Sequence, residues 1–279
     1  MDMRNLMAKL NKQVGATLST PVTVRDVENF PEADDVRSRK MWTRMTDVVA
    51  VVADLKSSTK LGTGRHINTT VRLYHAATGG GVEVATRFGP EFTDIQGDGF
   101  FSLFHGQDAY ARAIAAAMSL AYFSKEVLEP RITQFLGEDC PATGLKVGIA
   151  AGRLAVGPVG VRGATELVWP GKPVNWAFKC SGAADRHQIV VTERVYQRVV
   201  LPSEYLLRQC YVIGHQHGNW RAGSMWASIE VQALPKVPCF VRKIPWCPDV
   251  VNASCKAVLD GETRQPASDW QRFRHFVGV

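Results

Sequence analysis

Runs of apolar residues along the chain predict its strands. Residues 48–53 read VVAVVA without a polar interruption, which is typical of a strand covered on both faces. Two further apolar runs flank Gly97-Asp98-Gly99. They predict a hairpin, because glycine adopts the positive φ angles that tight turns require. Strands are also predicted over 82–88 and 143–160, so that strands and helices alternate through the middle of the chain.

Apolar residues at helical spacing predict two long helices between these strands. The segment 107–128 is rich in alanine, the residue with the highest helix propensity, and Pro130 lies just beyond it. The segment 60–78 precedes Gly79-Gly80-Gly81, and this run of glycines is expected to end the helix.

Shorter patterns predict the remaining elements. The first is a helix over 3–13. A short strand, a Pro-Gly turn and a helix follow one another within 165–184, and a strand and a helix lie within 188–199, with Thr192 as the helix N-cap. A late hairpin is predicted to pair 204–213 with 222–232. The central order strand–helix–strand–strand–helix–strand predicts an α/β (α+β) fold with a ferredoxin-like βαββαβ core.

Changes in composition suggest three parts of the chain. Residues 1–45 are polar and interrupted by proline, and are predicted to be an N-terminal extension. Residues 46–232 contain the alternating elements and are predicted to form one compact domain. Residues 233–279 contain five prolines and are predicted to be an irregular C-terminal extension.

The overall composition is that of a globular protein. The chain has 279 residues, of which 46% are hydrophobic and 21% charged. No apolar run approaches the ~18 residues of a membrane span, and the first 20 residues lack the apolar core of a signal peptide. We therefore expect a cytoplasmic protein with no membrane partner.

The net charge of +7 suits an anionic partner. The basic residues are scattered, with no run of five or more, so that we do not expect nucleic-acid binding. Six cysteines occur without a CxxC pair, and reduced thiols are expected in a cytosolic protein. Whether Cys239, Cys247 and Cys255 bind a metal such as zinc is left open by their wide spacing.

Two aspartates carry the main chemical signal. Asp54 ends the apolar run 48–53, and Asp98 lies at the predicted hairpin tip. Carboxylates on adjacent strands can share Mg²⁺ or Mn²⁺, which prefer oxygen ligands and bridge to phosphates. The segment Ser57-Ser58-Thr59 then leads into a helix whose free backbone N–H groups can hold a phosphate. Each aspartate taken alone is equally compatible with an ordinary cap or turn.

Four segments in order resemble the class III nucleotidyl cyclases, the family of adenylate and guanylate cyclase catalytic domains. They are VADLKSST, IQGDGFFSLF, LKVGIAAGRLAVGPVG and WPGKPVNWAFK, and the resemblance spans about residues 46–230. Each motif by itself is weak evidence for this family. The four motifs together indicate the family because they occur in its order and with compatible spacing.

The resemblance implies roles for specific residues. Asp54 and Asp98 would bind two ions of Mn²⁺ or Mg²⁺, with the Leu55 carbonyl as a further ligand, and the backbone of Ser57, Ser58 and Thr59 would hold the triphosphate. Lys146 would contact a phosphate. Asn175 and Lys179 would come from the second subunit of a homodimer, where Asn175 orients the ribose and Lys179 replaces the arginine that stabilises the transition state.

The base-reading positions depart from those of purine cyclases. Asp94 lies where adenylate cyclases carry lysine and guanylate cyclases carry glutamate, and Val168 lies where they carry Asp, Thr or Cys. Asp94 accepts hydrogen bonds only, so guanine, cytosine and uracil all remain compatible partners, as does a solvent-facing Asp94 that reads nothing.

A second likeness favours pyrimidines. Ala50 four residues before Asp54, Arg87 before the QGDG tip, and the short C-terminal extension resemble the Pycsar pyrimidine cyclases of bacterial antiphage defence. That likeness implies a pyrimidine nucleoside triphosphate as the substrate and cyclic UMP or cyclic CMP as the product. UTP is the predicted substrate because an ionised Asp94 could accept a hydrogen bond from uracil N3–H. CTP is the near alternative, because cytosine offers its N4 amino group as a donor. The alternatives are an adenylate or guanylate cyclase, a catalytically dead nucleotide-binding module, and a polymerase-like palm domain.

Overall fold

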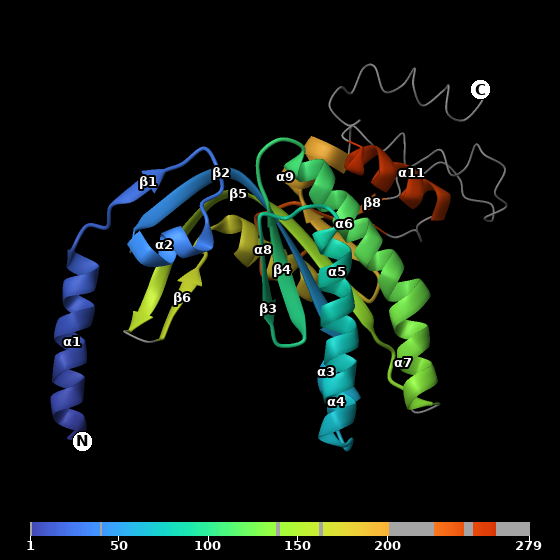
Figure 1. Cartoon of the computed structure of the whole chain (residues 1–279), viewed down its shortest axis with the longest axis horizontal. Coiled ribbons are helices and arrows are strands. Elements are labelled where there is room, and N and C mark those ends of the chain that lie inside the picture. Colours follow the sequence, from blue (N-terminus) through green and yellow to red (C-terminus); the bar gives the residue numbers. More distant parts are fainter. Residues whose placement is uncertain are drawn as a thin grey trace. The chain divides into compact units, whose positions relative to one another are not determined.

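The computed structural model describes residues 2–39, 41–137, 140–161, 164–200, 226–242 and 248–260. The chain forms two compact units, one of residues 1–45 and 155–169 and the other of residues 46–154 and 170–279 (Figure 1). Strands β2 (Trp42–Lys56) and β5 (Gly144–Val161) contribute residues to both units.

A mixed sheet forms the centre of the larger unit. Besides β2 and β5, its strands are β3 (Phe92–Gln96), β4 (Gly99–Phe104), β7 (Ile189–Thr192), β8 (Trp226–Ile229) and β9 (Cys239–Arg242). They lie in the order β3-β4-β2-β5-β7-β9-β8. The first four strands of this order, with the helices that connect them, are the predicted ferredoxin-like βαββαβ core.

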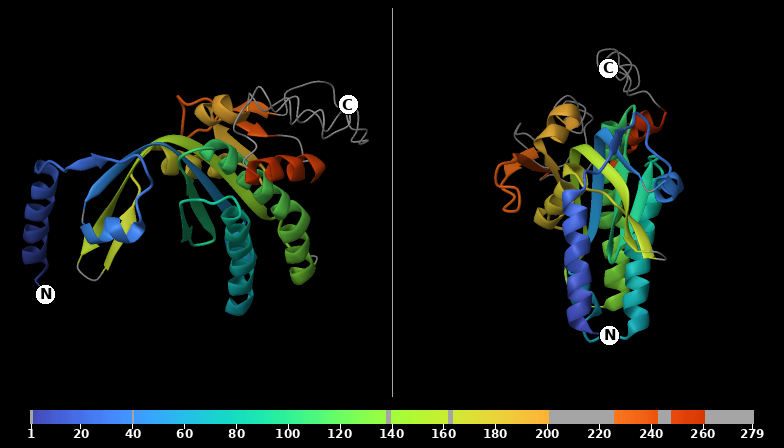
Figure 2. Two further views of the ribbon diagram at one scale, coloured as in Figure 1. Left: turned by 45° about the horizontal axis from the view of Figure 1, so that its top comes forward. Right: turned by 90° about the vertical axis from the view of Figure 1, so that its left-hand side faces the viewer.

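Helices cover one face of this sheet. They are α4 (Ile67–Tyr74), α5 (Gly80–Thr86), α6 (Ala109–Phe123), α7 (Glu129–Leu136) and α11 (Pro248–Leu259). α4 continues into α5 and α6 into α7, and α6 packs against both α5 and α11 (Figures 1 and 2). Alternate residues of the strands point into this layer, where Val51, Phe100 and Phe104 are buried with Ala116 and Leu120 of α6. None of the described helices combines the length and apolarity that a membrane crossing requires.

The glycine run 79–81 does not end a helix, and this prediction was wrong. A π-helical turn over His75–Gly79 leads directly into α5, with helical backbone angles at Gly79 and Gly80. A Cβ on Gly80 would lie 2.6 Å from the Phe123 ring, and one on Gly81 would lie 2.7 Å from the Phe100 ring. These glycines therefore let the helix approach α6 and β4 closely. The predicted strand over 82–88 is replaced by α5.

The second long helix also continues beyond its predicted end. A π-helical turn over Ser124–Leu128 follows α6 and leads into α7, which carries Pro130 in its first turn. Proline is tolerated there because a first-turn N–H needs no helical acceptor. The helix ends at Gly137, whose φ of 79° only glycine adopts without strain.

The C-terminal region is more regular than predicted. Strand β9 lies between β7 and β8 and pairs antiparallel with both, and α11 packs on α6. The expectation of an irregular segment was therefore wrong for Cys239–Arg242 and Pro248–Leu259, while 243–247 and 261–279 lie outside the described residues. Of the predicted late hairpin, β8 is observed, while 204–213 lies outside the described residues. Thr192 lies at the N-cap of α9 (Glu193–Val195) as predicted, without a capping hydrogen bond from its side chain.

The smaller unit contains α1 (Met3–Ser19), β1 (Val24–Asp26), α2 (Ala33–Arg39), β6 (Ala164–Val168) and the adjoining ends of β2 and β5. Arg44 donates two hydrogen bonds to Asp26, at 2.6 and 2.7 Å, across the parallel pair β1–β2. Helix α1 begins at an Asp2 N-cap and extends six residues past its predicted end at residue 13.

The glycine run allows a prediction about stability. Gly81→Ala is expected to lower the free energy of unfolding by about 1–3 kcal/mol, because the added methyl group overpacks against Phe100. Gly79→Ala is the matched control, since no atom lies within 4 Å of a Cβ there. It is expected to raise the free energy of unfolding by about 0.5–1 kcal/mol through helix propensity. Urea denaturation measures both, and equal effects would contradict the packing role.

Candidate active site

The end of β2 and the β3–β4 hairpin place two carboxylates at one edge of the larger unit. Asp54 pairs with Gly99 across β2 and β4, and Asp98 directly precedes Gly99. The turn consists of Gly97 and Asp98, with a φ of 66° at Gly97. Asp98 makes no ion pair or hydrogen bond with its side chain in the described part of the chain. The predicted hairpin is therefore confirmed, and its tip adjoins Asp54.

Gly99 leaves the side of Asp54 uncovered. A Cβ at this position would lie 2.7 Å from the Ala53 carbonyl oxygen and 3.4 Å from Asp54 Oδ1. A side chain there would therefore fill the space next to the carboxylate. Because Mg²⁺ and Mn²⁺ are bound by one or two carboxylates together with substrate phosphates, the bare glycine and the two aspartates fit such an ion.

Lys146 of β5 lies against the same carboxylate. Its Nζ is 2.6 Å from Asp54 Oδ2, and both side chains are mostly shielded from solvent. The strand order places β5 next to β2, so that Lys146 and Asp54 meet across the sheet. The Lys146 ammonium group therefore contacts Asp54, the predicted metal ligand, and is close enough to the site to bind a phosphate.

The chain turns sharply after β2. Leu55 is buried, and Ser57 adopts a left-handed conformation (φ 63°) at the N-cap of α3 (Ser58–Gly62). The turn puts Ser58 and Thr59 in the first turn of that helix, so the predicted helix start next to these residues is confirmed. The predicted continuous helix over 60–78 was wrong, because α3 ends at Gly62 and α4 begins only at Ile67. Lys56 forms an ion pair with Asp185, and this ammonium group holds the pKa of the Asp185 carboxyl below its usual range.

Helix α8 (Lys172–Ala183) packs on the other face of the sheet. A Cβ at Gly148 of β5 would collide with the Ala177 carbonyl oxygen, so that only glycine permits this close approach. Ser181 Oγ donates a hydrogen bond to the Lys146 carbonyl oxygen at 3.1 Å. The strand that carries Lys146 therefore also fixes the position of α8.

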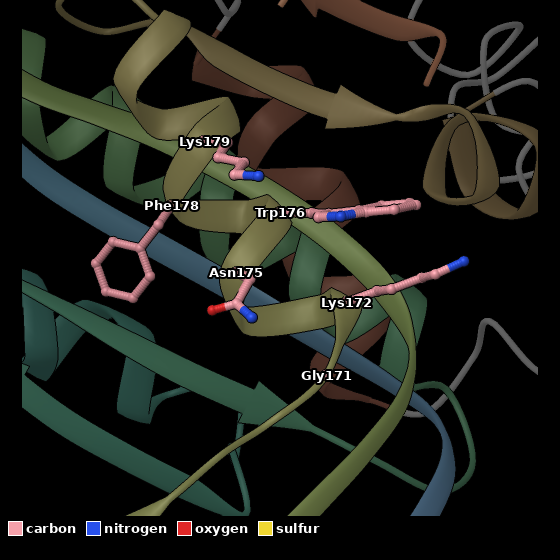
Figure 3. A pocket seen from close by; sticks show the side chains of 6 residues that line it. All are labelled: Gly171, Lys172, Asn175, Trp176, Phe178 and Lys179. Carbon is pink, nitrogen blue, oxygen red and sulfur yellow. The ribbon is translucent and has the colours of Figure 1, made fainter. Parts of the chain in front are cut away.

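The outer side of α8 forms an open hollow of about 580 Å³. It is lined by Gly171, Lys172, Asn175, Trp176, Phe178 and Lys179 (Figure 3). Asn175 and Lys179 are exposed and one helical turn apart, and Lys172 Nζ lies 4.9 Å from the centre of the Trp176 ring. The lining contains none of Asp54, Asp98 and Lys146. One chain therefore presents two groups of predicted site residues, one at the sheet edge and one on α8.

The other predicted residues have diverse surroundings. Asp94 pairs with Phe101 across β3 and β4, and accepts a 3.4 Å hydrogen bond from Gln96. Arg87 ends α5, in the helix layer over the opposite face, and pairs with Glu83. Val168 ends β6 in the smaller unit, opposite Gly157.

Sequence reasoning missed two polar contacts beside the site. The first is the hydrogen bond from Gln96 to Asp94. The two residues are two apart in a predicted strand, and this spacing could have indicated that their side chains lie on the same face. The Lys56–Asp185 pair joins residues far apart in sequence, which no local pattern indicates.

The cysteines do not gather in the described part of the chain, where no group of three or more metal-ligating side chains occurs. Cys239 packs with Cys180 on one side of the sheet. Cys255 Sγ lies 3.2 Å from Ser119 Oγ on α6. Burial raises the pKa of the Cys255 thiol. Cys247 lies outside the described residues, so a site that includes it stays untested.

Two curated relatives show which family the chain resembles. No family model matches the chain. A uridylate cyclase of Propioniciclava tarda is 37% identical over 93% of this chain and 85% of its own length. A uridylate cyclase of Micromonospora echinofusca is 34% identical over 98% of this chain and 89% of its own.

Solved structures show the same fold. The adenylyl cyclase CyaB from P. aeruginosa superposes with a TM-score of 0.57 at 14% identity, covering 75% of this chain and 98% of its own. The non-canonical dimeric guanylyl cyclase domain of the RhoGC fusion protein from Blastocladiella emersonii gives a TM-score of 0.52 at 13% identity, covering 71% of this chain and 97% of its own. The predicted fold class is therefore confirmed.

Proposed function

Because the chain belongs to the family of uridylate cyclases, we propose that it converts UTP to 3′,5′-cyclic UMP and pyrophosphate. In this reaction the ribose 3′-oxygen forms a bond to the α-phosphorus, and the bond from that phosphorus to the leaving pyrophosphate breaks. The 3′-hydroxyl proton is released. The observation that carries the proposal is the contact of Lys146 with Asp54 beside the bare Gly99, which supplies a cation and an anion where a metal-bound triphosphate needs both.

The sheet edge is proposed to hold the triphosphate. Asp54, Asp98 and the Leu55 carbonyl would hold two ions of Mn²⁺ or Mg²⁺. Such ions lower the pKa of the attacking hydroxyl and neutralise charge on the leaving phosphates. Lys146 would move from Asp54 to a phosphate oxygen as the ions enter. The backbone N–H groups at Ser57, Ser58 and Thr59 would add neutral donors to the phosphates.

Helix α8 is proposed to complete the site of a second subunit. Asn175 would hold the ribose so that its 3′-oxygen lies in line with the leaving group, and Lys179 would stabilise the charge that develops on the phosphoryl oxygens. The lining of the α8 hollow contains none of Asp54, Asp98 and Lys146, and this supports a homodimer with shared sites. Lysine gives a point charge in place of an arginine fork, so that Lys179 leaves the phosphate geometry less constrained.

The biological setting is part of the same proposal. The resemblance to Pycsar pyrimidine cyclases favours a cytoplasmic synthase of a second messenger in antiphage defence, with Mn²⁺ as the preferred ion. Arg87 is proposed as a further position that contacts the base or a phosphate, with a surface salt bridge as its alternative role. Val168 is proposed as a base-contacting position because it occupies the base-reading position of the purine cyclases.

One experiment tests the proposed reaction. Purified full-length protein is incubated with each of the four nucleoside triphosphates and Mn²⁺, and products are identified by mass spectrometry. We expect cyclic UMP as the main product. Faster formation of cyclic AMP or cyclic GMP would support a purine cyclase in place of the pyrimidine assignment, and no cyclic product from any triphosphate would support a nucleotide-binding module without activity.

A further inference from the structure

The peptide group between Lys56 and Ser57 joins the end of β2 to the proposed triphosphate-binding segment. It follows Leu55, whose carbonyl is a proposed metal ligand, and its N–H belongs to Ser57. In the described part of the chain this N–H donates no hydrogen bond. The direction in which the peptide group points therefore determines whether a phosphate can accept from that N–H.

One buried side chain holds the carbonyl end of this peptide group. Thr143 Oγ1 donates a hydrogen bond to the Lys56 carbonyl oxygen at 2.8 Å, and Thr143 is fully buried. Thr143 directly precedes β5, so this contact lies on the β5 side of β2. The C=O and N–H groups of a planar trans peptide point in opposite directions. The Ser57 N–H therefore points away from β5, toward the side of β2 on which β4 and the Asp98 turn lie.

The chain around Thr143 is itself tightly packed. A Cβ at Gly144 would collide with the His187 ring, so that only glycine fits next to Thr143. The Leu145 N–H donates a hydrogen bond to the buried Ser124 Oγ at 2.6 Å. Thr143 therefore acts on the Lys56 carbonyl from a fixed position.

A second contact of Lys56 is the weaker constraint. Its ammonium group pairs with Asp185, and the two side chains are 36% and 55% exposed. Exposed ion pairs contribute little because water screens them, and a flexible four-carbon stem separates the ammonium group from the backbone. The buried hydrogen bond from Thr143 therefore has the larger influence on the direction of the peptide group.

We propose that Thr143 is a positioning residue for the triphosphate, an inference that rests on the proposed function. Its hydroxyl orients the Lys56–Ser57 peptide group so that the Ser57 N–H donates to a phosphate oxygen, while Thr143 itself does not touch the substrate. A hydrogen bond that is equally strong in the bound substrate and in the transition state lowers KM and leaves kcat unchanged. Loss of the Thr143 hydroxyl should therefore weaken binding rather than slow the chemical step.

Two conservative replacements provide the test. Thr143→Val removes the hydroxyl and keeps the branched shape, whereas Thr143→Ser keeps the hydroxyl. We expect Thr143→Val to raise the KM for UTP about tenfold with kcat within about twofold of wild type, and Thr143→Ser to retain the wild-type KM. The Kd of inorganic triphosphate in the presence of Mn²⁺, measured by isothermal titration calorimetry, should rise by the same factor as KM.

Folding and remote effects are controlled separately. Thr143→Ala also lacks the hydroxyl and should show the same rise in KM, and thermal unfolding gives the temperature range in which each variant is folded. Thr17→Val is the matched control, because Thr17 Oγ1 also donates to a backbone carbonyl oxygen, that of Gln13 on α1. It should leave both KM and Kd unaltered.

The outcomes separate this inference from the proposed function. An unchanged KM in Thr143→Val, a fall in kcat without a rise in KM, or an equal loss in Thr143→Ser would overturn the positioning role and leave the cyclase assignment intact. A larger effect of Asp185→Asn than of Thr143→Val would overturn it as well, because the ion pair would then be the main constraint. A wild-type protein that neither binds inorganic triphosphate nor forms a cyclic product would overturn the proposed function too.

Discussion

Replacement of Asp54 or Asp98 with alanine is expected to lower kcat for UTP cyclisation by at least about a thousandfold. Asp54 lies at the end of β2 and Asp98 at the hairpin tip beside it, so each variant removes half of the proposed carboxylate pair. Asp54→Asn is the more stringent version, because it keeps the size of the side chain and removes only its charge. Cyclic UMP formation under saturating Mn²⁺ measures the effect.

Folding must be separated from chemistry in this experiment. Asp54 forms the ion pair with Lys146, and its loss leaves a partly buried ammonium without a partner. Thermal unfolding of each variant is therefore recorded beside its activity. Asp34→Asn is the control, since Asp34 forms an exposed ion pair with Arg37 on α2 and should retain full activity. Near-native turnover in a folded Asp54 or Asp98 variant would refute a two-ion site.

Two inactive variants are expected to restore activity when mixed. In the proposed homodimer, Asp54 comes from one chain of each site and Asn175 from the other. A heterodimer of an Asp54→Ala chain and an Asn175→Ala chain then contains one intact site and one doubly damaged site. With free exchange of subunits, half of the dimers are mixed, so that about a quarter of wild-type activity should return.

A mixture of Asp54→Ala with Asp98→Ala is the control for this result. Both changes affect the same half of the site, so that every mixed dimer carries two damaged sites and no activity should return. Differently tagged chains and sequential affinity purification show whether mixed dimers form. Mixed dimers of the first pair that stay inactive would contradict sites shared between chains.

The sequence predicted the core of the fold because strand signals are local. The local sequence is enough to predict a strand at 48–53 and a hairpin turn at 97–99. The order of these elements and the two helices along the chain is typical of one common topology, the ferredoxin-like core. The comparisons and the strand order confirm that part. The strand β9 escaped prediction because it is four residues long and lies among prolines, and its place depends on pairing with β7 and β8 rather than on its own pattern.

Glycine misled the prediction for a physical reason. The residue is equally suited to ending a helix and to letting a helix pack closely, and only the neighbours distinguish the two. Phe100 and Phe123 lie 19 or more residues from Gly80 and Gly81, so a local pattern cannot reveal the contact. The same limit explains why the ion pair of Lys146 with Asp54 was not foreseen, although both residues were selected from their motifs.

The position of β9 has a consequence for the order in which the protein is made. β7 hydrogen-bonds to β5 on one side and to β9 on the other, and β8 joins the sheet through β9. Once residues 1–200 have been made, β7 therefore lacks its β9 partner, and the N–H and C=O groups on that side can pair with another nascent chain. Among the described residues, β9 supplies the pairing on that side, so residues 239–242 complete the hydrogen bonding of a strand made some 50 residues earlier.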